Sequence, residues 1–246
     1  MELAIMNRSG GDMQTYPVNL RDVRTGYEEI LAAQEEVGGE LVVRAKVAAG
    51  GAKRFDLLIC GEDTDASASS VIGVVFHHHL CNAYFSEDGE KKSPPLCSSL
   101  DGVTGTIRES GEVRSCAECP YNEYGSSTKG RGKACKNMIR LYLLTEGIPA
   151  PLVISLPPTS IEKWRNYRLS LLAVNHLKVD EVVTELTILK AENAKGDAYG
   201  VVKPKMLGRI TDEMCEVVDF FKAGLGTAIE LSADDYNRGE GEESHA

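Results

Sequence analysis

The sequence predicts a mainly β fold of the α+β class, and two observations lead to this prediction. From residue 139 onward the pattern is strand, strand, helix, strand, strand, helix. If one earlier strand joins the same sheet, the first of these helices falls between its third and fourth strands. That order is typical of the OB-fold, a small five-stranded barrel, although other α+β sheets share it. Residues 97–140, in contrast, are rich in glycine and cysteine and too poor in apolar residues for a core, which indicates an insertion.

The first third of the chain contains one helical pattern and three strand patterns. Residues 22–37 place Tyr27, Ile30 and Leu31 at the spacing of an amphipathic helix, and Gly38-Gly39 ends it. Short apolar runs bounded by glycine or polar residues predict the strands, with an acidic, serine-rich loop before the last of them. The strands cover residues 41–47, 55–60 and 71–77.

The last 110 or so residues carry stronger signals, four strands and two helices. Thr159 and Glu162 form a capping-box pattern, in which each side chain bonds the backbone of the other residue at the start of a helix. Thr211 has the position of a helix cap as well. A polar, turn-rich segment between the last two strands predicts a hairpin. The strands cover residues 139–144, 151–156, 182–190 and 199–210, and the helices cover residues 159–174 and 211–222.

Four of the seven cysteines lie in residues 97–140. Cys116 and Cys119 form a C-x-x-C turn, which brings two thiolates close enough to hold one soft cation. Eighteen residues separate Cys97 from this turn and fifteen separate the turn from Cys135, on loops that can complete a tetrahedron. A segment without a core of its own needs another source of folding free energy, and zinc binding supplies about 10 kcal/mol. We therefore expect a structural zinc ion bound by Cys97, Cys116, Cys119 and Cys135.

Two other uses of these cysteines are less favoured. We expect no signal peptide, and the number of cysteines is odd, which suits a reducing compartment better than disulfides. A redox-active C-x-x-C is disfavoured because no strand of a thioredoxin-like unit precedes Cys116. One variant of the zinc site is open: a histidine of the run His77-His78-His79 could replace a cysteine, Cys97 first, since its spacing is the loosest.

Charge is distributed unevenly along the chain. The net charge of −10 argues against a protein that coats nucleic acid through a general positive field. Residues 129–140 nevertheless hold five basic and no acidic side chains, whereas residues 230–246 hold six acidic ones and one arginine. We expect one OB-like domain over residues 1–230, with 97–140 as its zinc-binding insertion, and a disordered acidic tail over residues 231–246. No apolar run reaches the ~20 residues of a membrane helix, so we expect a cytoplasmic protein without membrane contact.

The sequence lacks the usual signatures of enzymes. It contains no phosphate-binding P-loop, no H-E-x-x-H helix and no G-x-S-x-G elbow. A zinc ion with four sulfur ligands has no open position for water, which is typical of structural sites. We therefore predict a non-enzymatic protein without catalytic residues. A metal-dependent nuclease that uses His77, His78 or His79 is the alternative that these histidines leave open.

Aromatic and basic side chains alternate around the C-x-x-C turn. Aromatic rings can stack on unpaired bases while cations follow the phosphates, and stacking contributes roughly 1–3 kcal/mol per base. This composition predicts an interface for single-stranded nucleic acid, with a solvated basic surface as the plain alternative. The predicted contacts are Tyr121, Tyr124, Lys129, Arg131, Lys133, Lys136 and Arg140.

Four stretches of the chain are distinctive, namely CSSLDGVTG, CAECPYNEYGS, GKACKNMIRLYLL and PLVISLPPTSIEKWRNY. Together they resemble a group of phage and prophage proteins of bacteria that are described as single-stranded-DNA-binding-like, over about residues 71–210. The resemblance implies a replication or recombination accessory protein with an OB-like core and a zinc insertion. It supports the four cysteines as ligands and identifies no residue that contacts DNA.

These observations together predict a single-stranded-DNA-binding protein of phage DNA replication and recombination, in the cytoplasm of a bacterial host. Its acidic tail would recruit replication proteins, and a homodimer is compatible with this role. The main rival is a zinc-stapled protein–protein interaction module, for instance a polymerase-associated or host-takeover factor.

Overall fold

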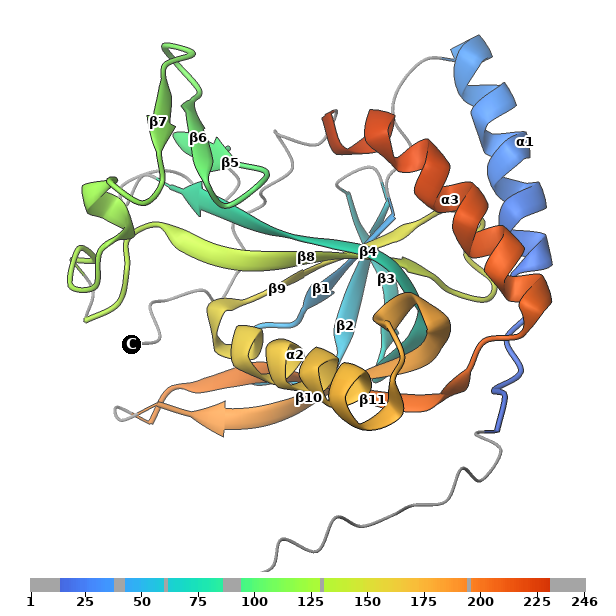
Figure 1. The fold of residues 1–246 in the computed structure, drawn as a ribbon. Coiled ribbons are helices and arrows are strands. Elements are labelled where there is room, and N and C mark those ends of the chain that lie inside the picture. The colour runs from blue at the N-terminus through green and yellow to red at the C-terminus, as the bar shows by residue number, and fades with distance from the viewer. Residues whose placement is uncertain are drawn as a thin grey trace, which may run out of the picture.

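The structure is a computed structural model that describes residues 14–37, 43–59, 62–85, 94–128, 131–193 and 196–230. Strands account for 42% of it and helices for 26%, which confirms the predicted β-rich α+β class. Figure 1 shows the strands at the centre and the helices around them. The predicted acidic tail, residues 231–246, lies outside the described residues.

The described residues form one mixed sheet of eleven strands. Its main path runs β3-β2-β1-β9-β8-β4-β5-β6-β7, and the β10–β11 hairpin branches from β4. Paired strands are antiparallel, except that β1 and β9 pair in parallel. The strands are β1 (Val43–Val47), β2 (Phe55–Ile59), β3 (Glu62–Ala68), β4 (Ser70–Tyr84), β5 (Cys97–Ser99), β6 (Thr104–Ile107), β7 (Val113–Ser115), β8 (Lys136–Leu144), β9 (Leu152–Leu156), β10 (Val182–Glu192) and β11 (Ala198–Arg209).

Strand β4 connects the parts of this sheet. It is fifteen residues long, and it pairs first with β10, then along most of its length with β8, and at its end with β5. The first change of partner occurs at Gly73, where any Cβ would lie only 2.3 Å from the carbonyl oxygen of Leu144. A β-bulge between Val75 and His77 follows directly. The hairpin and the β8–β9 pair therefore belong to one sheet because both are hydrogen-bonded to β4.

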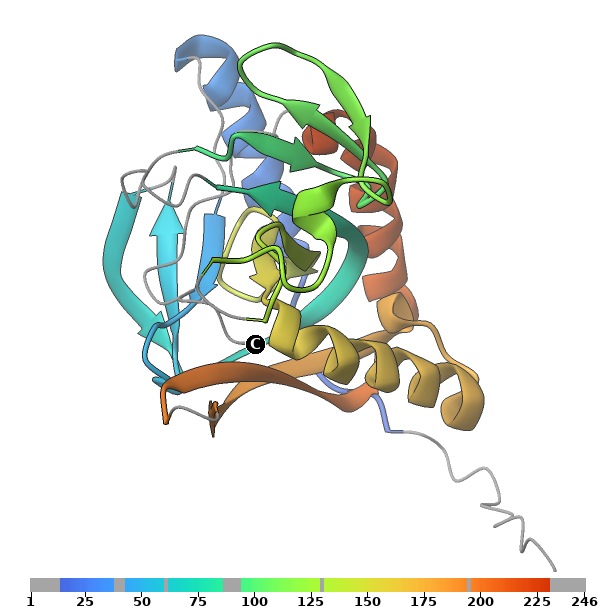
Figure 2. The ribbon, with the colours of Figure 1, turned by 90° about the vertical axis from the view of Figure 1, so that its left-hand side faces the viewer.

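Helices cover both faces of the sheet (Figures 1 and 2). α1 (Arg21–Val37) and α3 (Asp212–Glu230) pack on the face of β4 and β8 that carries Phe76. The ring of Phe221 in α3 lies 5.0 Å from that of Tyr27 in α1 and 5.8 Å from that of Phe76. α2 (Pro158–Ser170) lies along the β10–β11 hairpin and continues into a π turn at Leu171–Asn175.

Two hydrogen bonds and one large ring attach α2 to the rest of the fold. The Tyr167 hydroxyl lies 2.7 Å from Thr184 Oγ1 of β10. The Val202 N–H of β11 donates to Ser160 Oγ at 2.9 Å in a fully buried position. Trp164 is 1% exposed and belongs to the apolar core on this face of the sheet, together with Leu141 and other residues of β8, β9 and the hairpin.

Most of the predicted elements are confirmed. The helix predicted at residues 22–37 is α1, and the last four predicted strands are β8, β9, β10 and β11. The cap of the last helix is confirmed too, since the Met214 N–H donates to Thr211 Oγ1 at 3.3 Å.

Three predictions about elements are wrong in detail. The capping box does not form, because α2 begins at Pro158 and has no side-chain cap. Proline suits the first helical position, so Thr159 lies inside the helix instead of before it. The acidic loop predicted before residue 71 contains β3, and the strand predicted at residues 71–77 continues as β4 to Tyr84.

The buried ring of Trp164 gives a test of this arrangement. Trp164→Ala should lower the free energy of unfolding by about 3–5 kcal/mol, because a large cavity would open under α2. Leu169→Ala on the same helix is the matched control, since Leu169 is 57% exposed and its loss should cost at most about 0.5 kcal/mol. Urea titrations of the three proteins measure both values. Equal stabilities would contradict the position of α2.

Candidate metal centre and nucleic-acid interface

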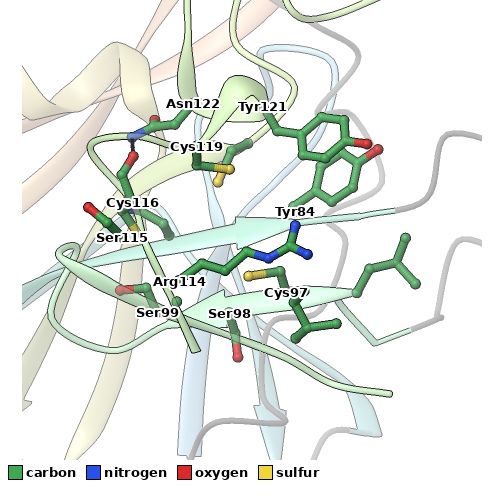
Figure 3. A pocket seen from close by; sticks show the side chains of 15 residues that line it. Tyr84, Cys97, Ser98, Ser99, Arg114, Ser115, Cys116, Cys119, Tyr121 and Asn122 are labelled. Carbon is green, nitrogen blue, oxygen red and sulfur yellow. Dashed lines mark hydrogen bonds between the residues drawn. The ribbon is translucent and has the colours of Figure 1, made fainter. Parts of the chain in front are cut away.

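The four predicted cysteine ligands come from separate turns at the far end of β4. Cys97 begins β5, Cys116 directly follows β7, Cys119 precedes a short 3-10 helix at Pro120–Asn122, and Cys135 directly precedes β8. All four line one cavity with a volume of about 120 Å³ (Figure 3). The fold therefore brings the four thiols of the prediction to one place, although they are spread over almost forty residues.

Gly105 of β6 shows how close two of the sulfurs are. A Cβ at this position would lie 3.1 Å from Cys97 Sγ and 3.5 Å from Cys116 Sγ. The two sulfurs therefore lie no further apart than the sum of these distances. A side chain at residue 105 would occupy space between them, so glycine leaves the centre of the cluster open.

The pKa values of Cys97 and Cys135 also reflect the closeness of the four cysteines. Burial first, and then the neighbouring thiolates of Cys116, Cys119 and Cys97, raise the pKa of Cys135 to about 12. Burial and then the charges of Cys116 and Cys119 also raise the pKa of Cys97. Thiols whose ionisation is disfavoured in this way are suited to a cation, which replaces their protons and pairs with the thiolates.

The donor set fits zinc in its chemistry, since four sulfurs are the ligands of many structural zinc sites. Among the residues that the structure describes, however, no three His, Cys, Asp or Glu side chains have an arrangement that could hold a metal ion. Zinc at this cluster thus stays a prediction. None of His77, His78 and His79 lines the cavity.

A chain of asparagine side chains supports the turns that carry the cysteines. Asn122 Nδ2 donates to the Cys116 carbonyl oxygen at 2.7 Å, the bond drawn in Figure 3. Asn137 Nδ2 of β8 donates to Asn122 Oδ1 at 2.9 Å and to Asn82 Oδ1 of β4 at 2.6 Å. Asn82 in turn donates to the Gly102 carbonyl oxygen at 3.1 Å. The C-x-x-C turn is therefore connected to two central strands without a metal.

The C-S-S-x-D-G stretch forms the tight connection between β5 and β6. Asp101 Oδ1 accepts the backbone N–H groups of Val103 and Thr104, both at 2.7 Å, and the Ser99 hydroxyl at 2.9 Å. These hydrogen bonds lower the pKa of the Asp101 carboxyl. Gly102 has a φ of 74°, a value that favours glycine. This explains the residue types of the stretch without a direct role in binding.

Two tyrosines, Tyr84 and Tyr121, line the cavity, and a third, Tyr124, lies nearby in the chain. The rings of Tyr84 and Tyr121 are stacked, with centroids 4.2 Å apart and an angle of 14° between the planes. Tyr121 is 43% exposed and Tyr124 is 84% exposed. Lys133 contacts two residues of this segment. Its Nζ donates to Asn122 Oδ1 at 3.2 Å and lies 5.1 Å from the centre of the Tyr124 ring.

The remaining predicted nucleic-acid contacts have mixed positions. Arg131 is exposed and Lys136 is partly exposed, whereas Lys129 lies outside the described residues. Arg140 does not fit the prediction: it is 1% exposed, because it lies in β8 between β4 and β9. An enclosed guanidinium cannot offer its charge to a phosphate on the surface.

Two residues of the site were missed at the level of sequence. Tyr84 ends β4 and supplies the ring under Tyr121. Arg114 lines the cavity and forms an ion pair with Glu112 at 2.9 Å. Glu112 is the main cause of the raised pKa of Arg114, and the thiolates of Cys119 and Cys97 contribute less. Figure 3 shows the Arg114 side chain extending between Cys97 and Cys119. Neither residue belongs to a motif, so only the folded chain reveals them.

The three histidines lie inside β4, not at a strand end as the pattern suggested. His79 Nε2 is 3.3 Å from the Tyr142 hydroxyl, and His77 packs beside the same ring at 5.6 Å. His78 points to the other face, edge-on to Trp164 at 5.7 Å. Burial lowers the pKa of all three, that of His78 to about 4.

A scan against protein-family models gave no match for this chain, and searches of curated proteins and of solved structures gave none either. The candidate site is therefore judged by its own geometry. Within the described residues, no helix is long and apolar enough to cross a membrane.

The low pKa of His78 predicts a pH dependence of stability. Below about pH 6.5 the unfolded chain takes up a proton at His78 that the folded chain does not bind until about pH 4. Stability should therefore fall as the pH is lowered through this window, by about 2–3 kcal/mol from this residue alone. Denaturant titrations of the wild type and of His78→Gln between pH 4 and 7.5 test this. The loss should be smaller in the variant, and an equally steep loss would contradict the assignment.

Proposed function

We propose that this protein binds single-stranded DNA, without catalysing a reaction, in the DNA replication and recombination of a phage. The observation that carries the proposal is the pairing order of five strands. β4 pairs with β8, β8 with β9, β4 also with β10, and β10 with β11. α2 lies between β9 and β10 in the chain. This supports an OB-like core in which β4 is the first strand and β11 the fifth.

In OB-folds, oligonucleotides bind across the second and third strands and between two loops, those after the first and the fourth strands. With β4 as the first strand, the cysteine-rich insertion is the first of these loops and the tip of the β10–β11 hairpin is the second. Figure 1 shows both on the same side of the molecule, with the start of β8 between them. This position of the insertion supports the proposal that it acts as a DNA-binding loop.

Side chains on the insertion supply the chemistry that single strands require. The Tyr84–Tyr121 stack presents one ring to solvent, and a base can continue the stack on Tyr121. Lys133, Lys136 and Arg131 follow within the same segment and can neutralise phosphates. The negative net charge of the chain does not oppose this, because screening limits the effect of distant charges to about 8–10 Å at physiological salt.

Zinc would act as a structural staple on this proposal. Cys97, Cys116, Cys119 and Cys135 would hold the ion, and four sulfur ligands leave no coordination position for a substrate. The segment from Tyr121 to Lys133 lies between the ligands Cys119 and Cys135. Fixing both of its ends reduces the conformational entropy that DNA binding would otherwise cost.

The partners and the setting of this function follow from the sequence. The acidic residues of the tail at 231–246 suit contacts with replication proteins. The setting, the cytoplasm of a bacterial host during phage replication, rests on the resemblance of the four distinctive stretches.

A zinc-stapled protein-interaction module is the second candidate, and one observation favours it. Leu169, Leu172 and Val174 near the end of α2 are 57%, 48% and 69% exposed. Neighbouring exposed apolar side chains are typical of protein-binding surfaces. On this alternative the insertion would be a rigid element and the end of α2 would contact the partner.

The staple can be tested by metal analysis and stability. The purified chain should contain one zinc ion, and Cys119→Ser should lose the ion and several kcal/mol of stability. Zinc binding should release protons and weaken as the pH falls, because the pKa values of Cys97 and Cys135 are raised in the metal-free protein. Cys215→Ser on α3 is the matched control and should keep the metal. A stable chain without zinc would end the proposal for this site.

DNA binding can be tested with a labelled oligo-dT at several salt concentrations. We expect micromolar or tighter binding, with a log–log salt slope of about −0.7 for each phosphate contacted. Tyr121→Ala should weaken it by roughly 1–3 kcal/mol, and Lys133→Gln should reduce the slope. Lys163→Gln, on an exposed position of α2, is the control.

The negative outcomes separate the candidates. Absence of binding at micromolar protein, even after removal of the residues beyond Leu231, would exclude the DNA-binding function and favour the interaction module. Degradation of the oligonucleotide with added divalent metal, lost in His77→Ala, would indicate a nuclease instead.

A further inference from the structure

A second cavity lies away from the cysteine cluster, between β4, the end of α2 and the segment that leads into β10. Its volume is about 220 Å³. His77 and His78 line it from β4, Arg168 and Leu172 from α2 and its π turn, and Lys178 and Asp180 from the segment before β10. It shares no residue with the cysteine cavity.

The charges in this cavity favour an anion. Neither Arg168 nor Lys178 forms an ion pair with another described residue. The only carboxylate among the described residues that line the cavity is that of Asp180, and it is paired with Lys222 of α3. Two cations of this cavity therefore have no ion-pair partner among the residues that the structure describes. Arg168 lies close enough to lower the pKa of His78, which adds a neutral ring with one N–H donor.

Three irregularities of the backbone lie in, or directly beside, the elements that line this cavity. The β-bulge between Val75 and His77 turns β4 just before the two histidines. The π turn at Leu171–Asn175 carries Leu172, and His176 after it has a left-handed φ of 56°. Bulges, π turns and left-handed non-glycine residues are uncommon and concentrate at functional sites. Their coincidence around one cavity points to a binding role.

Strand pairing along β4 is also interrupted at this point. β10 pairs with β4 only through residues 70–73, and β5 begins its pairing at Asn82. In the described part of the chain, no strand pairs with the stretch between them on the edge opposite β8. The cavity occupies part of this gap, so a ligand could approach without displacing a strand.

We propose that this cavity binds a phosphate monoester group. The planar guanidinium of Arg168 can bond two phosphate oxygens, Lys178 can supply a second positive charge, and a neutral histidine can donate an N–H. Leu172, which is 48% exposed, forms an apolar wall for the sugar or base of a nucleotide. The phosphate can belong to a free nucleotide or to the 5′ end of a DNA strand. The site is independent of the proposed DNA-binding loops and does not require them.

Calorimetric titration of the full chain with inorganic phosphate, thymidine 5′-monophosphate and thymidine tests the site. The two phosphates should bind with a Kd of roughly 1 mM or below, and thymidine should not bind. Arg168→Gln and Lys178→Gln should each weaken binding by at least about tenfold, because each variant loses charge-assisted hydrogen bonding to the phosphate. Arg165→Gln, an exposed arginine of the same helix that does not line the cavity, should leave binding unchanged.

Two oligonucleotides that differ only in a 5′-phosphate distinguish a site for DNA ends from a site for free nucleotides. Tighter binding of the phosphorylated strand, lost in Arg168→Gln, assigns the site to DNA ends, whereas equal binding assigns it to free nucleotides. Thermal unfolding confirms that the variants are folded. The proposal is overturned if neither phosphate binds at about 10 mM, or if the double variant binds both as the wild type does.

Discussion

The hydrogen bonding of β4 to three partners is the constraint on which the rest of the structure depends. One strand of fifteen residues pairs with β10, β8 and β5 in turn. Gly73 allows the first change of partner, because any side chain there would collide with the Leu144 carbonyl. The far end of the same strand supplies Tyr84 and Asn82 to the cysteine-rich insertion. The insertion and the cavity at His77 and His78 thus lie along one strand.

The insertion is organised by polar and sulfur groups in place of an apolar core. Its turns are held by the amides of Asn82, Asn122 and Asn137 and by the carboxylate of Asp101. These bonds bring four thiols together, and burial followed by the charges of neighbouring cysteines raises the pKa values of two of them, Cys97 and Cys135. Zinc would replace the protons of these thiols and pair with the thiolates. On the proposed function, the metal would therefore add to the hydrogen bonds of the asparagine side chains in holding the turns together.

Local patterns predicted much of the fold because they reflect short-range physics. The amphipathic spacing of residues 22–37 and the polar tip between β10 and β11 fix a helix and a hairpin within the segment itself. The capping box failed for an equally local reason, since Pro158 takes the first helical position. The length of β4 escaped prediction because its partners β8 and β10 are supplied by distant parts of the chain. β3 pairs with the neighbouring β2 and escaped prediction because its acidic, serine-containing sequence has no apolar run.

The sequence by itself determined the residue types of the candidate site: four cysteines at metal-ligand spacing, with aromatic and basic residues among them. Only the tertiary structure decided which of these residues are neighbours. It placed the four thiols around one cavity, stacked Tyr84 on Tyr121, and enclosed Arg140 within the sheet. It also gathered Arg168, Lys178 and two histidines into a second cavity that no motif announces. The physical reason is that strand pairing and burial join residues far apart in the chain, and neither is encoded in a local pattern.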